Sequence, residues 1–104
     1  MKNYIAEIIG TFGMIFCGCG AMVINDFTGG TITHPGVAIT WGLIVMAMIY
    51  AFGDISGAHF NPAVTVGFAV AKKFKWNEVP KYIVSQFIGA MSASLLLFYL
   101  FPES

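Results

Sequence analysis

The sequence has little charge and no arginine. Only 10% of its 104 residues are charged and 58% are hydrophobic, with a mean hydropathy of +0.80. So few polar groups do not cover the surface of a water-soluble domain of this length. The net charge is zero, so nothing in it favours binding to nucleic acid. The composition therefore predicts a protein of the lipid bilayer with no nucleic-acid partner.

Residues that carry out chemistry are also scarce. Cys17 and Cys19 are the two cysteines, and their spacing on a helix points them in different directions, so we interpret them as small packing residues. His34 and His59 are the only histidines, and no Ser-His-Asp or metal-ligand spacing occurs. We expect no enzyme activity, no metal and no cofactor.

Long apolar runs are what the sequence does contain. Residues 4–24, 35–53 and 78–101 are each predicted to cross the bilayer as a helix. The first run would rise roughly 31 Å, enough for a hydrocarbon core of about 30 Å. Asn77 is expected to cap the third helix, and Pro80 is tolerated in its first turn.

Small residues recur within the third apolar run. Ser85, Gly89 and Ala93 follow one another at intervals of four residues. This spacing places them on one helix face and allows a second helix to approach closely in lipid. We therefore expect a tight helix contact along this face.

Residues 54–71 are too polar at their start to face lipid and too apolar at their end for an ordinary loop. Asp54 is expected to be a solvated loop residue. A helix from Asn61 to Ala71 would rise only about 16 Å, half a bilayer. Irregular backbone persists at this depth only where protein buries it or where it lines a watery cavity. The predicted fold is an all-α membrane protein with three transmembrane helices and one re-entrant half-helix.

The Asn61-Pro62 pair begins this half-helix. Pro62 fits the first helical position, and the Asn61 side-chain oxygen can cap the helix while its NH2 group remains free to donate. A helix N-terminus carries roughly +0.5 charge, so this tip would bind the oxygen of a neutral solute and repel cations. Asn-Pro is also a common turn, but its position between two apolar runs favours a pore.

Four segments carry a family resemblance. AEIIGTFGMIFCGCG, WGLIVMAMIY, ISGAHFNPAVT and VSQFIGAMSAS occur in that order. Together they resemble the first half of the aquaporin and glycerol-facilitator family, the major intrinsic proteins, and most closely its nodulin-like branch. The resemblance implies one half of an inverted repeat, whose two NPA motifs meet at the midplane, and passage of water, glycerol and small uncharged metalloid hydroxides.

The resemblance also implies roles for individual residues. Trp41 matches an aromatic position of the outer constriction, although it could instead be an interfacial anchor. The family constriction includes an arginine after the second NPA motif, and the matching residue here is Val64. The implied pore residues are Asn61, Pro62 and Ala63 in the NPA motif, Gly57, Ala58, His59 and Phe60 in a carbonyl ladder, Trp41 and Val64 at the constriction, and Glu7 and Gln86 as hydrogen-bond partners of the re-entrant backbone.

A single repeat of this kind needs a partner to enclose a pore. Two identical chains could pair as an inverted repeat only if one inserts upside down. Lys2 and the lysines from Lys72 to Lys81 would all lie on one membrane face, which favours a single orientation. Two arrangements stay open: an antiparallel homodimer, with eight chains forming four pores as the family implies, or pairing with a complementary half-channel.

Two functions follow from the sequence. The first is a passive channel for water and small neutral solutes. In this case the chain would be a multi-pass protein of the plasma (inner) membrane. The alternative is a non-conducting structural or modulatory subunit of a full-length channel.

Overall fold

The computed structural model describes residues 1–102, and all regular structure in this part of the chain is helical. Three of its helices are long and apolar enough to cross a membrane, which confirms the predicted fold class. The elements are α1 (Lys2–Phe27), α2 (Thr33–Ser56), α3 (Pro62–Val70), a 3-10 turn (Trp76–Glu78) and α4 (Val79–Leu100).

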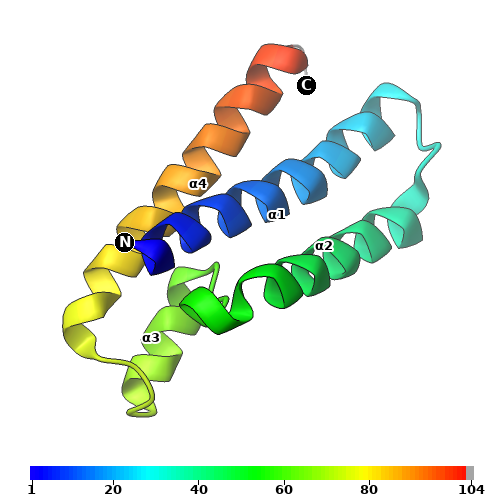
Figure 1. Cartoon of the computed structure of the whole chain (residues 1–104). Helices are drawn as coiled ribbons and strands as arrows, with labels where there is room; N and C mark the ends of the chain where they lie inside the picture. The colour runs from blue at the N-terminus through cyan, green and yellow to red at the C-terminus, as the bar shows by residue number, and fades with distance from the viewer. Residues whose placement is uncertain (103–104) are drawn as a thin grey trace.

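The three long helices pack side by side, with α1 between α2 and α4 (Figure 1). The short helix α3 packs against α4 and runs back to the end of the molecule at which α4 begins. The chain therefore enters the bundle after α2, turns within it, and leaves through α3 on the side from which it came.

The contact between α1 and α4 uses the small residues found in the sequence. Ser85, Gly89 and Ala93 are all buried on α4. A Cβ atom at Gly89 would overlap the backbone oxygen of Ile8 and lie 3.0 Å from the backbone nitrogen of Phe12. The expected tight helix contact is therefore confirmed, because the two backbones meet where only glycine fits.

Two local expectations were wrong. Asp54 is exposed but lies in the last turn of α2, because that helix continues until Gly57 adopts a left-handed conformation and its N–H bonds to the carbonyl of Gly53. Asn77 lies in the 3-10 turn and does not cap α4. That turn runs directly into α4, so no extended residue remains for a side-chain cap. The re-entrant loop is thus shorter than expected.

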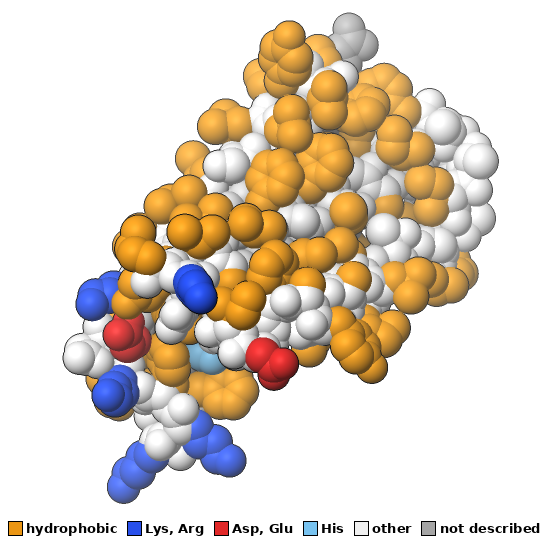
Figure 2. All heavy atoms as spheres, viewed as in Figure 1, with side chains coloured by type: hydrophobic (Ala, Val, Ile, Leu, Met, Phe, Trp, Pro, Cys, Tyr) orange, Lys and Arg blue, Asp and Glu red, His pale blue; other side chains and the backbone are white. Residues whose placement is uncertain are grey.

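The surface separates apolar from charged residues. Hydrophobic side chains cover most of the visible face, and the lysines gather with acidic residues at the end where α1 and α4 begin (Figure 2). Large side chains such as Leu43, Phe87 and Phe98 are exposed on the long helices. Such a surface suits contact with lipid or with other apolar helices.

Candidate functional site

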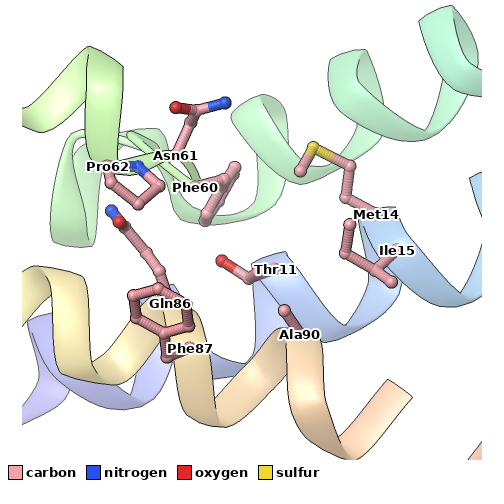
Figure 3. A pocket seen from close by; sticks show the side chains of 9 residues that line it. All are labelled: Thr11, Met14, Ile15, Phe60, Asn61, Pro62, Gln86, Phe87 and Ala90. Atoms are coloured by element: carbon pink, nitrogen blue, oxygen red, sulfur yellow. The ribbon is translucent and has the colours of Figure 1, made fainter. Parts of the chain in front are cut away.

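Asn61 and Pro62 form the tip of α3. Asn61 has an extended backbone, and its side-chain oxygen accepts a 2.8 Å hydrogen bond from the backbone N–H of Ala63. Pro62 is the first helical residue, where a missing N–H has no consequence. The expected cap is confirmed. The exposed Asn61 NH2 group has no hydrogen-bond partner within residues 1–102, and Figure 3 shows the amide turned away from Gln86.

The tip lies part of the way along the bundle and not at its end. The ring of Phe60 rests on Gly10 of α1, where a Cβ atom would overlap it. Gly10 lies about 12 Å along a helix that is about 39 Å long. Phe60 itself is only 4% exposed. The re-entrant loop therefore reaches about a third of the way along α1, starting from the lysine-bearing end of the bundle.

Three residues of the loop have left-handed backbones. Gly57, Ala58 and Phe60 have φ angles of 84°, 54° and 55°. Glycine adopts this conformation without strain, but each L-residue with a side chain loses roughly 1–2 kcal/mol there. The loop is therefore held by contacts from the rest of the fold.

The carboxylate of Glu7 provides those contacts from α1. Glu7 is completely buried. Its Oε1 accepts hydrogen bonds from the Phe60 N–H (2.9 Å) and the Gln86 side chain (2.8 Å). Its Oε2 accepts from the Ser56 hydroxyl (2.7 Å) and the His59 N–H (3.2 Å). Four donors use about the full accepting capacity of an ionised carboxylate, so Glu7 stabilises the loop as the sequence suggested.

Gln86 contacts the loop backbone only through other side chains. We expected it to bond that backbone, but its NH2 group donates to Glu7 and, at 2.9 Å, to the Thr65 hydroxyl. The Thr65 oxygen also lies 2.9 Å from Nδ1 of His59, and the Thr65 hydroxyl group donates to the carbonyl of Asn61. Gln86 thus joins α4 to both α1 and α3 through side chains.

The His59 ring packs in an aromatic cluster behind the loop. It stacks on Phe68 with ring centres 4.8 Å apart and contacts Phe74 and Tyr82. Burial lowers the pKa of His59, and the nearby Glu7 carboxylate opposes this shift. The ring is therefore a packing group within this cluster.

A cavity of about 160 Å³ lies beside the tip, between α1, α4 and the loop (Figure 3). Asn61 and Gln86 line it, but Trp41 and Val64 do not. Trp41 is half-buried over Gly18 of α1, and Val64 is 41% exposed on α3. The structure brings the NPA motif and its supporting residues together, while the constriction role of Trp41 and Val64 stays a prediction.

Three residues of the site were not found from the sequence. Ser56 and Thr65 complete the hydrogen bonds around Glu7 and Gln86, and Gly10 makes room for Phe60. Each is a small or hydroxyl-bearing residue within or beside an apolar helix. Such residues are a signal of close packing or buried hydrogen bonding in membrane helices, but their partners are distant in sequence.

Three helices long and apolar enough to span a membrane, with a re-entrant loop and a half-helix packed against them, define a class of integral, multi-pass membrane protein. The sequence matches the Major intrinsic protein family over residues 1–104, and the chain belongs to that family.

Individual relatives agree with this assignment. The chain is 58% identical over 106 residues to NIP4-1 of Arabidopsis thaliana, covering 99% of this chain and 38% of that protein. It is 56% identical over 93 residues to aquaporin NIP1-2 of Oryza sativa subsp. japonica, covering 89% and 31%. The aquaglyceroporin from Plasmodium falciparum superposes with a TM-score of 0.83 at 30% identity, over 96% of this chain and 41% of that one. The chain thus spans about a third of the length of these curated relatives.

Proposed function

We propose that this chain forms one half of a passive membrane channel for water and small uncharged solutes such as glycerol and metalloid hydroxides. The observation that carries the proposal is the tip of α3, where the side-chain oxygen of Asn61 caps the helix and its exposed NH2 group has no partner within residues 1–102. Family membership supports it, because the matching relatives include an aquaporin and an aquaglyceroporin. No catalytic step and no cofactor is needed.

The tip of α3 would act on solutes by hydrogen bonding and on cations by its electrostatic field. Asn61 donates to the oxygen of a passing solute, and the carbonyls of residues 57–60 offer acceptors along the same path. The N-terminus of α3 has a partial positive charge, which opposes the entry of cations, including hydronium. In this proposal Trp41 and Val64 form walls of the constriction, without the arginine of the family pore.

A second half would close the pore. The exposed part of the α3 tip faces that half, which is either a second copy of the chain inserted in the opposite orientation or a complementary half-channel. The gathering of lysines at one end favours one orientation in a cell membrane, whereas reconstitution into vesicles inserts copies in both orientations and so permits the antiparallel pair. Eight half-chains would make four pores in the plasma membrane.

Stopped-flow light scattering on proteoliposomes that contain the purified chain tests this function. We expect osmotic water and glycerol permeability above that of protein-free vesicles. Asn61→Asp keeps the helix cap but replaces the donor with a negative charge. Losing one hydrogen bond of about 1.5 kcal/mol lowers the permeation rate about tenfold.

The matched control is Asn77→Asp, which makes the same change at an exposed position in the 3-10 turn. It is expected to leave permeability unchanged. Vesicles that are no more permeable than protein-free ones, although the chain is folded and inserted, would contradict the proposal. That result would favour the structural or modulatory subunit.

A further inference from the structure

Two buried oxygen atoms beside the α3 tip have no hydrogen-bond partner. They are Oγ1 of Thr11 and Oε1 of Gln86, the only such buried side-chain atoms within residues 1–102. Thr11 is 3% exposed and Gln86 is 2% exposed. A buried polar group without a partner costs about 1–3 kcal/mol, so each such atom indicates a missing ligand.

The hydrogen bonds of Gln86 determine what its oxygen can accept. Both hydrogens of its NH2 group are used, one by Glu7 and one by Thr65. Turning the amide over would bring its oxygen against the Glu7 carboxylate, so the observed orientation is fixed. Oε1 therefore needs a donor from outside this network.

Thr11 differs from the other buried hydroxyl residues in this part of the chain. Thr65 and Ser85 each donate to the backbone carbonyl four residues earlier, the usual arrangement in helices, and Ser56 donates to the Glu7 carboxylate. Thr11 does not bond the carbonyl of Glu7, and Figure 3 shows its hydroxyl directed toward the loop side of the cavity. It is free to accept or donate there.

Both residues line the cavity beside the tip, together with Asn61. Its volume of about 160 Å³ exceeds the roughly 30 Å³ that one water molecule occupies in the liquid. Met14, which has a flexible side chain, also lines it, one turn beyond Thr11 on α1.

We propose that this cavity binds a neutral hydroxyl group, from water or from a small polyol, which bridges Thr11 and Gln86. The hydroxyl hydrogen is donated to Gln86 Oε1, and the hydroxyl oxygen accepts from Thr11. The cavity lining contains no charged side chain, so an ion has no counter-charge there. The site extends the Glu7 network that holds the re-entrant loop, and it does not depend on conduction.

Water-edited solid-state NMR on the labelled full chain in lipid bilayers tests the site. The measured quantity is the early rate of proton magnetisation transfer from water to Thr11 and Gln86, relative to the rate for Thr65. Thr65 is the reference because it is fully buried and its hydroxyl is already bonded. We expect transfer at least twofold faster at Thr11 and Gln86 than at Thr65.

Variants and a second ligand sharpen the test. Thr11→Val should reduce transfer at Gln86 to the Thr65 rate, and Thr11→Ser should preserve it. Thr40→Val is the control and should leave transfer at Gln86 unchanged, because the Thr40 hydroxyl bonds the carbonyl of Gly36 and does not line the cavity. Added 13C-glycerol should give cross peaks to Thr11 if a polyol hydroxyl binds, whereas unchanged water transfer without cross peaks identifies water as the ligand.

A dry cavity would overturn the proposal. This means transfer at Thr11 and Gln86 no faster than at Thr65, with no glycerol cross peak, as expected if a counterpart protein segment fills the space. Transfer at Gln86 that stays fast in Thr11→Val would also overturn the bridge. Either result can occur in vesicles that conduct water, so this test and that of the channel are separate.

Discussion

Replacing Glu7 with Gln should loosen one end of the re-entrant loop. The best placement keeps the new amide oxygen at the Oε1 position, where it still accepts from Phe60 and Gln86. The new NH2 group then takes the Oε2 position, where the Ser56 hydroxyl can turn to accept. The His59 N–H cannot turn and loses its acceptor.

The expected cost falls on one backbone amide. A buried N–H without a partner costs about 1–3 kcal/mol, which corresponds to a rise of roughly 10- to 100-fold in the opening that permits hydrogen exchange. The assay is residue-resolved amide exchange of the chain in lipid or detergent. We expect protection of His59 to fall by this amount and protection of Phe60 to fall less.

Glu78→Gln is the matched control for this prediction. It makes the same chemical change in the 3-10 turn before α4, where Glu78 accepts from the hydroxyl of Tyr4. The loop amides should then exchange as in the unmodified chain. Unchanged protection of His59 in Glu7→Gln would refute the conclusion that the carboxylate holds the loop.

Two further predictions concern packing and pH. Gly89→Val should push the new side chain against the backbone of Ile8 and destabilise the chain by about 1–3 kcal/mol. The measurement is the midpoint of thermal unfolding in detergent, which should fall. Gly42→Val is the control and should leave the midpoint unchanged, because Gly42 faces open space. Burial lowers the pKa of His59, so the unfolded chain takes up its proton first and stability should fall as the pH drops below about 6.5. His59→Gln should weaken this dependence and His34→Gln, at an exposed position, should not; equal slopes in all three chains would contradict the assignment.

The sequence was sufficient to predict the half-helix because its signals are local. Asn61 caps a helix whose first residue is Pro62, and the two lie side by side in the chain. The close approach of α1 and α4 was predicted for a similar reason, since the small residues on α4 follow the helical repeat. Helix propensity and the spacing of residues along the chain are enough to predict such features, whatever the tertiary contacts around them.

The missed features depend on tertiary contacts. Ser56 bonds Glu7 across 49 positions, and Thr65 bonds Gln86 across 21. A hydroxyl in an apolar run does not reveal which distant group it meets. Asp54 was predicted to lie in a loop because it is polar and follows Gly53, but α2 ends only where Gly57 turns left-handed.

The position of Glu7 has a consequence for biogenesis. The carboxylate that receives the loop lies in α1, which is synthesised before the loop, and the amide that bonds this carboxylate, on Gln86, lies in α4, which is synthesised after it. Until α4 inserts, the loop has only part of its hydrogen-bonding environment. The half-helix should therefore settle late in membrane insertion, after the helices on both sides of it in the sequence have crossed.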